Sequence, residues 1–107
     1  MKKTTLLFAA TALSLAGVRI DAMAKPAPHL KGAALAAEAK VDLAHARAIA
    51  LKARPGRITD QELEKEAGGS GLRYSFDIRV GKTTWEVGVD ARTGAVLENA
   101  KEGPHPD

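Results

Sequence analysis

Alternation of apolar and polar residues between positions 72 and 98 is the feature that most constrains the fold. Large apolar side chains take every second position from Leu72 to Val80, and the pattern resumes from Trp85 to Val89. Because successive side chains of a strand point to opposite faces of a sheet, the apolar groups share one face. The run therefore predicts an antiparallel meander whose apolar face forms most of the core.

Aromatic residues are concentrated in the same run. Tyr74, Phe76 and Trp85 lie there, and the remaining one, Phe8, lies near the N-terminus. Trp85 is a candidate recognition anchor, since aromatic residues of this kind often dominate interfaces. We predict a core position for it instead, because burying an aromatic contributes about 2 to 3 kcal/mol and the chain has few other large apolar groups.

Two turns divide the meander. Gly81 and Lys82 join two alternating runs, which is typical of a tight hairpin. Further on, the Asp90 carboxylate is placed to accept backbone N–H groups of its own turn, and Gly94 is suited to a positive φ. We interpret the Asp90 to Gly94 turn as architectural rather than as a contact loop.

One helix is well defined before the meander. Asp42 is a good N-cap residue, and small apolar residues follow at helical spacing on one stripe. Pro55 disfavours helical conformation in the residue before it, so we expect the helix to end at Arg54. The Ala-rich segment 25–40 is expected to be a partly helical linker.

Residues 58–66 are ambiguous. As a strand, the segment would present an acidic outer row of Asp60, Glu62, Glu64 and Glu66. As a helix, it would start with a capping box, and Glu, Gln, Lys and Ala are poor strand formers. The residues themselves leave both alternatives open. The glycine-rich loop 68–71 then forms a flexible connection to the meander.

The N-terminus has the layout of a secretory signal peptide. Residues 1–24 contain a positive start, an apolar segment and a small-residue site that predicts cleavage near Ala24. Arg19 and Asp21 interrupt the usual pattern, so an uncleaved anchor remains the alternative. The apolar run is short for a stable membrane span, which needs about 20 residues. We therefore expect a periplasmic or secreted protein, a location that the absence of Cys also fits.

Charge and length restrict the functions that remain. The formal net charge of the chain is +3, of which the predicted leader carries +2, so the rest is close to neutral. No clustered basic surface is indicated, and we expect neither nucleic acid nor an anionic membrane as a partner. The residues after the leader suffice for one small domain. The tail 101–107 is predicted to be disordered, because its two prolines prevent regular structure.

No catalytic constellation is evident. The sequence lacks a nucleophile elbow, a P-loop and paired catalytic carboxylates, and we predict a protein that is not an enzyme and needs no cofactor. His29, His45 and His105 are weak candidates for a metal site, since two of them lie in segments expected to be flexible, which cannot hold ligands rigidly. The acidic row would spread its carboxylates along a line, whereas Ca²⁺ needs six to eight converging oxygens.

In this order the motifs resemble the PepSY domain family. The matching stretches are the Ala48 to Ala53 helix, the Pro-Gly break, the Glu62 to Glu64 stretch, the alternation from Tyr74 to Ile78, Trp-Glu-Val at 85–87, and Val89 to Leu97. The resemblance implies an α+β fold in residues 41–100, with one main helix packed on a small antiparallel β-sheet of three to four strands. It also favours a strand at 58–66. It carries no catalytic residues, and it implies restraint or inhibition of a protease. The loop 68–71 departs from the family pattern.

The functional hypothesis is an exported module that binds a polypeptide partner. The resemblance implies that this partner is a protease, which the module would inhibit or regulate. It would offer its sheet surface, or an edge strand, for docking. Charged residues on the polar face of the sheet are the candidate partner-binding residues: Asp60, Glu62, Glu64, Arg73 and Arg79. The alternative is an envelope sensor of a metal or small ligand that uses the acidic row and His45. The sequence does not indicate the oligomeric state.

Overall fold

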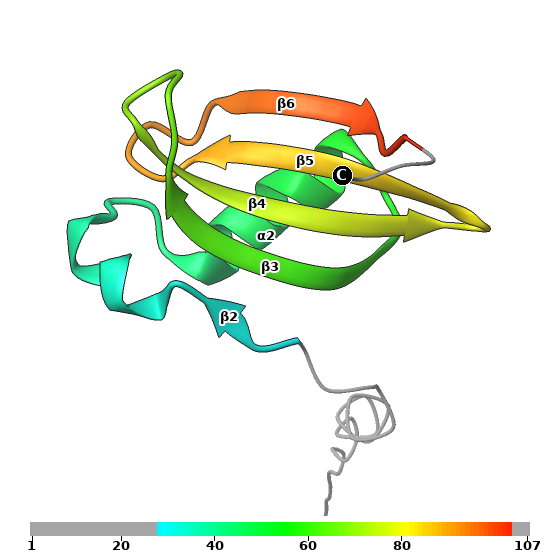
Figure 1. The fold of residues 1–107 in the computed structure, drawn as a ribbon, viewed down its shortest axis with the longest axis horizontal. Coiled ribbons are helices and arrows are strands. Elements are labelled where there is room, and N and C mark those ends of the chain that lie inside the picture. The colour runs from blue at the N-terminus through cyan, green and yellow to red at the C-terminus, as the bar shows by residue number, and fades with distance from the viewer. Residues whose placement is uncertain (1–27, 104–107) are drawn as a thin grey trace, which may run out of the picture.

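The computed structural model describes residues 28–103. The predicted signal peptide, its cleavage near Ala24 and the last four residues of the predicted tail lie outside the described residues. The elements, in chain order, are β2 (Leu30–Lys31), the 3₁₀ helix η2 (Ala33–Glu38), α2 (Leu43–Ala53), β3 (Arg57–Lys65), β4 (Leu72–Val80), β5 (Thr83–Asp90) and β6 (Val96–Lys101) (Figure 1).

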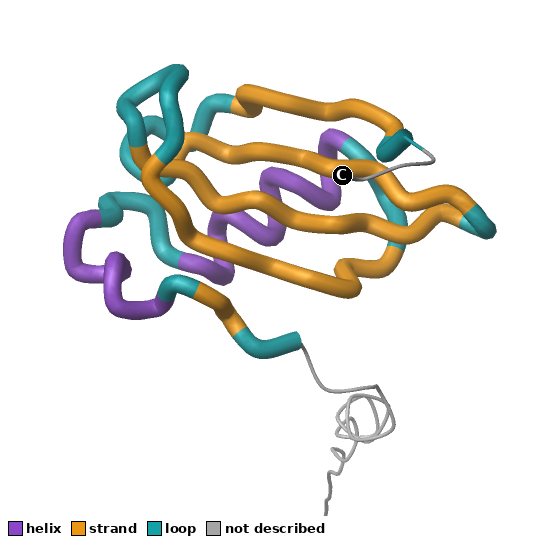
Figure 2. The backbone as a smooth tube through the Cα atoms, in the orientation of Figure 1, coloured by secondary structure: helices purple, strands orange, loops and turns teal. Residues whose placement is uncertain are grey.

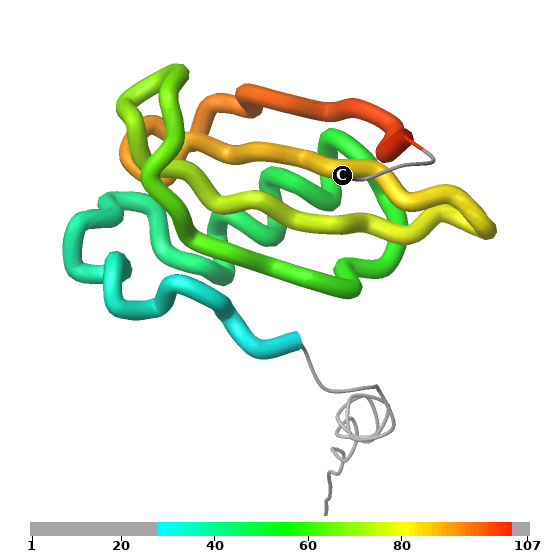
Figure 3. The backbone as a smooth tube through the Cα atoms, viewed as in Figure 1, coloured from blue at the N-terminus to red at the C-terminus, as the bar shows by residue number. Residues whose placement is uncertain are grey.

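One sheet with the strand order β2-β3-β4-β5-β6 forms the body of the protein. Strands β3 to β6 make the predicted antiparallel meander, which Figure 3 follows from green to red. Helix α2 lies across one face of the sheet and packs against β4, β5 and β6 (Figure 2). The α+β prediction is confirmed, with one helix packed on an antiparallel meander.

The predicted strand number of three to four is too low, because the described sheet has five strands. The added strand, β2, is two residues long and pairs in parallel with Gln61 and Glu62 of β3. Such a short strand has too few residues to produce an alternating pattern, and its formation depends on a neighbour that is distant in sequence. Gly32 then turns the chain away with φ 79°, and a side chain there would collide with the Leu63 carbonyl oxygen.

Helix α2 begins and ends where the sequence indicates. The Asp42 side chain accepts a hydrogen bond from the His45 N–H at 2.8 Å, as an N-cap does. Ala46 and Ala50 are fully buried, so the helix presents a stripe of small residues to the sheet and lies close to it. The last helical residue is Ala53, two residues before Pro55.

The ambiguous segment is a strand. β3 pairs along its length with β4, and the register shifts between Ile58 and Asp60 at a bulge. Ile58, Gln61 and Leu63 are buried on the face that α2 covers. The strand conformation, which the family resemblance favoured, therefore overrides the helical propensity of the Glu and Lys residues.

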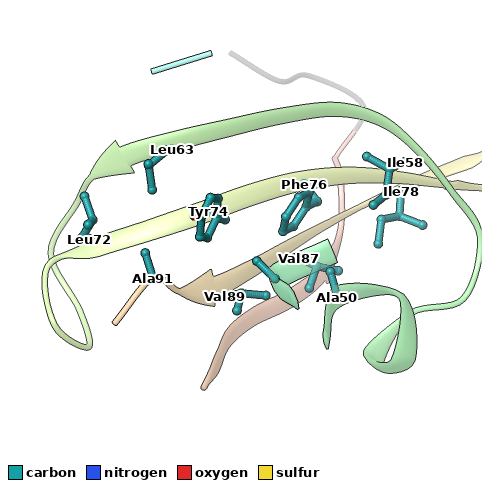
Figure 4. Close-up of a cluster of buried hydrophobic side chains, with 11 residues drawn as sticks. Ala50, Ile58, Leu63, Leu72, Tyr74, Phe76, Ile78, Val87, Val89 and Ala91 are labelled. Atoms are coloured by element: carbon teal, nitrogen blue, oxygen red, sulfur yellow. The ribbon is translucent and has the colours of Figure 1, made fainter. Parts of the chain in front are cut away.

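The core lies between α2 and the sheet. Tyr74 and Phe76 stack with their ring centroids 6.1 Å apart, and the Tyr74 hydroxyl donates to the Val41 carbonyl at 2.7 Å. The buried apolar side chains around them come from α2, β3, β4, β5 and the turn after β5 (Figure 4): Ala46, Ala50, Ile58, Leu63, Leu72, Ile78, Val87, Val89 and Ala91. The apolar alternation therefore identifies the packed face of the sheet correctly.

Trp85 is an exception to the predicted core. It lies on the helix side of the sheet but is only partly buried, and the Arg54 guanidinium covers its ring at 3.5 Å from the centroid. Arg54 is held there by a hydrogen bond from its Nε to the Asn99 side chain. The prediction that Trp85 belongs to the core is wrong, because the helix ends before it can cover this part of the sheet.

Candidate binding face

The sheet face opposite α2, called the open face below, is covered by no helix within residues 28–103. Directly opposed residues of neighbouring strands point to the same face, so the strand pairing defines its members. These are Arg57, Asp60, Glu62 and Glu64 on β3, Arg73, Ser75, Asp77 and Arg79 on β4, Thr84, Glu86, Gly88 and the buried Asp90 on β5, and Glu98 and Ala100 on β6. Charged and small side chains therefore dominate the open face.

All five candidate residues from the sequence lie on the open face. Asp60, Glu62 and Glu64 follow one another along β3, and the last of these is directly opposite Arg73 of β4. Arg79 lies near the other end of β4, is exposed, and donates from its Nε to the Gly81 carbonyl at 3.1 Å. The structure thus brings the five residues together on one surface.

Arg73 differs from the other four residues because it is buried. Only 8% of its surface is exposed. Its Nη1 lies 3.3 Å from the Glu98 carboxylate, and its Nη2 donates to the Ala67 carbonyl at 3.3 Å. The guanidinium lies over Gly88, where an added Cβ would come within 3.0 Å of Nη1. Its charge is therefore partly used inside the protein.

Three carboxylates form a line across the middle of the open face. Asp60 is directly opposite Asp77, which is directly opposite Glu86 on β5. We call these three residues the carboxylate row. Like charges in directly opposed positions destabilise a sheet. Asp60 has an ion-pair partner in Lys31 at 3.0 Å. Within residues 28–103, neither of the other two carboxylates has an ion pair or hydrogen bond from its side chain.

Burial and the neighbouring negative charges raise the pKa values of three carboxyl groups on the open face. Burial, followed by the charges of Glu102 and Asp60, raises the pKa of Asp77 above its ordinary value. Burial, followed by the charges of Glu98 and Asp77, raises the pKa of Glu86. Burial also raises the pKa of Glu64, although its hydrogen bond from Ser75 acts in the opposite direction. The row is therefore a site where an approaching positive charge would be stabilised.

The Asp90 turn is architectural, as its residues predict. Although burial opposes ionisation, hydrogen bonds from the backbone N–H groups of Arg92, Ser70 and Thr93 and from the Ser70 hydroxyl lower the pKa of Asp90 to about 2. Gly94 has a φ of 82°. Sequence reasoning missed Ser70, through which Asp90 also fixes the loop that departs from the family pattern. A lone Ser among glycines was the available signal.

The residues proposed for a metal site are not brought together. His45 lies on α2, on the helix side of the sheet, whereas the acidic row of β3 lies on the open face. His105 falls outside the described residues. Within the described range, no group of three or more His, Cys, Asp or Glu residues has a geometry suited to a metal ion.

A hollow of about 400 Å³ lies beside the β4–β5 turn. Its lining combines Lys82 and Lys101 with Glu102 and two threonines. This mixture of charges does not select a ligand class. In the described part of the chain, no helix is both long and apolar enough to cross a membrane.

The fold and the open face define a small module with one helix on an antiparallel sheet and a polar sheet surface for contacts. Residues 40–99 match the family described as the peptidase propeptide and YPEB domain, and the chain belongs to this PepSY family. Searches of curated proteins and of solved structures gave no significant match. Family modules of this kind are propeptide-like or inhibitor-like.

Proposed function

We propose that this chain is an exported, non-enzymatic PepSY module that binds a polypeptide partner, a protease in particular, through its open face. The observation that carries the proposal is the contrast between the two sides of the sheet. One side is filled by α2, whereas the other presents charged groups from four strands. Most of these groups, Asp77 and Glu86 among them, have no ion-pair partner within residues 28–103.

The proposed mechanism is occlusion by docking. A rigid sheet presents its side chains with little loss of conformational entropy on binding, so a partner gains most of the interaction energy of each contact. Restraint of a protease then requires only that the bound module covers the substrate cleft. No residue of the module takes part in bond making or breaking.

The test is an inhibition assay with a thermolysin-like metalloprotease and with proteases of the bacterial envelope. The purified protein should slow peptide cleavage in a saturable way, and crosslinking should recover a one-to-one complex. Substitution of Glu62→Lys on the open face should weaken inhibition, whereas Lys52→Glu on the exposed side of α2 should not. Absence of both inhibition and a crosslinked complex would refute the proposal.

A metal or small-ligand sensor is the competing function. No observation on the described residues favours it, since the acidic row and His45 lie on opposite sides of the sheet. Calorimetric titration with Ca²⁺, Zn²⁺ and Cu²⁺ separates the two functions, because a sensor requires heat of binding and the docking module does not.

A further inference from the structure

Over one half of the open face, like charges oppose each other across strands, whereas at the other end Glu64 is directly opposite Arg73. Arg57 is directly opposite Arg79, and the next pair on the open face, Asp60 and Asp77, belongs to the carboxylate row, in which acids oppose acids. A sheet that used these residues for its own stability would place opposite charges face to face, because such pairs stabilise it and like pairs destabilise it. The arrangement therefore calls for a charge supplied from outside.

The chain pairs two of the neighbouring carboxylates itself, whereas Glu62 and Glu64, like the row, have no ion-pair partner within residues 28–103. Lys31 lies 3.0 Å from Asp60, and Arg73 lies 3.3 Å from Glu98. Asp77 and Glu86 remain between these two ion pairs, on adjacent strands and both partly shielded from solvent. The residue opposite Glu86 on β6 is Ala100, whose small side chain leaves space above the sheet. A cationic side chain has room at this point.

Arg73 supplies a second and independent observation. Its side chain is nine-tenths buried, it extends over Gly88 toward Glu98, and its Nε has no hydrogen-bond partner among the described residues. The guanidinium thus lies one position along the strands from Glu86, with one donor unused. An unmet buried donor carries a free-energy cost of about 1 to 3 kcal/mol, which an incoming acceptor would relieve.

The two unmet requirements together identify one kind of occupant. A side-chain cation satisfies the two carboxylates, and a main-chain carbonyl would satisfy the Arg73 Nε once the side chain moves to expose it. A polypeptide offers both groups within a few ångströms of each other, whereas a free metal ion offers no acceptor.

We propose that Asp77 and Glu86 bind an Arg or Lys side chain of a basic polypeptide segment that lies across the open face beside Arg73. This inference deepens the proposed function, on which it rests, by defining the partner's chemistry. An arginine fits best, because its planar fork can donate to two carboxylates at once.

The experiment is a titration of the ¹⁵N-labelled full chain with a capped (Gly-Arg)₅ peptide, followed by amide chemical shifts. We expect saturable shifts centred on Asp77, Glu86 and Ala100, weaker shifts with (Gly-Lys)₅, and none with (Gly-Glu)₅. The affinity should fall as salt is added, since partly exposed charges are screened. No saturation up to about 1 mM peptide, or shifts centred elsewhere, would overturn the inference.

Matched variants separate a site from general charge attraction. Asp77→Asn combined with Glu86→Gln should weaken (Gly-Arg)₅ binding by about tenfold, because both carboxylates that face the cation are lost. Glu38→Gln combined with Glu66→Gln removes the same charge from exposed residues outside the row and should change the affinity less than about twofold. Equal weakening by both pairs would overturn the inference. The two single variants, each checked for folding by circular dichroism, repeat the test.

The failure of this inference differs from the failure of the proposed function. If wild type and Asp77→Asn/Glu86→Gln inhibit the protease equally, the partner docks without the row, and only the inference is wrong. If no protease is inhibited but (Gly-Arg)₅ binds at the row, the basic-segment site stands and the protease role is wrong.

Discussion

The two faces of this sheet are made by the same strands, yet the side chains on them find partners within the protein to different degrees. On the helix side, apolar groups of β3, β4 and β5 form one core with α2, and even the buried polar Gln61 is satisfied, through Arg47 and the Pro28 carbonyl. On the open face, like charges oppose each other and a buried guanidinium keeps an unused donor. The contacts that stabilise the fold are therefore concentrated on the helix side, which leaves the open face free for recognition.

The largest expected loss of stability tests the packing on the helix side, called the packed side below. Phe76 is fully buried beneath α2, so Phe76→Ala should lower the free energy of unfolding by about 3 to 5 kcal/mol, because it removes a large apolar group and leaves a cavity. The neighbouring Ser75→Ala, on the open face, should cost about 1 kcal/mol, since it loses one hydrogen bond to Glu64. Urea unfolding measures both. Similar losses would contradict the contrast between the faces.

Asp90 is a buried carboxylate at the end of β5, directly opposite Arg73. Asp90→Ala should cost about 3 kcal/mol in urea unfolding, because the N–H groups of Ser70, Arg92 and Thr93 lose a charged acceptor in a buried place. The loop 68–71 should also exchange its amide hydrogens faster in the variant. A stable variant with unchanged exchange would show that the turn does not depend on this carboxylate.

The pH dependence follows from the lowered pKa of Asp90. A carboxyl whose pKa falls from 3.8 to about 2 on folding stabilises the protein above pH 4, and this contribution is lost as the pH falls through about 2. The stability difference between wild type and Asp90→Asn should therefore shrink by about 2 kcal/mol between pH 5 and pH 2. Thermal unfolding of both proteins over that range measures it. A constant difference would contradict the ionised state.

The carboxylate row should change the stability with pH in the opposite direction to Asp90. Because folding raises the pKa values of Asp77 and Glu86, the row favours folding below pH 4 and opposes it as the pH rises through the raised values. Asp77→Asn/Glu86→Gln should therefore be more stable than wild type at pH 7 by about 1 kcal/mol, with no gain at pH 3. A loss of stability at pH 7 would mean that the row supports the fold.

The smallest expected effect concerns the contact between Arg54 and Trp85, at the edge of the packed side. Arg54→Ala removes the guanidinium from the Trp85 ring and should cost about 0.5 kcal/mol, as expected for a partly exposed cation–π contact. Since Trp85 is the single tryptophan, its emission should shift to longer wavelength as the ring becomes wetter. Unchanged emission would indicate that the ring is already fully hydrated.

The sequence predicts the packed face well because the signals there are local. Alternation from Leu72 to Val80 and a cap at Asp42 depend on neighbours in the chain. β3 could not be settled from its own residues, since its bulge after Ile58 breaks the alternation and Gln61 occupies an apolar position. The buried position of Gln61 depends on Arg47 and the Pro28 carbonyl, which are distant in sequence.

The open face was predicted in part. The five candidate residues are on it, but Asp77 and Glu86 were missed, although the two-residue turn at Gly81 fixes their register and places them opposite each other. The alignment of β3 beside them depends on a longer loop and a bulge, neither of which the sequence defines. Only the three-dimensional register therefore shows that the row extends to Asp60.

The pairing of β2 with β3 has a consequence for assembly. Along one edge of the sheet, β2 and the adjoining η2 cover part of the hydrogen-bonding groups of β3, whereas β6 leaves the other edge without a neighbouring strand in residues 28–103 (Figure 1). A sheet with two free edges can add strands without limit and grow into a fibre. If the β6 strands of two copies pair, the partly covered opposite edge hinders further addition, and the assembly stops at a closed pair with two-fold symmetry.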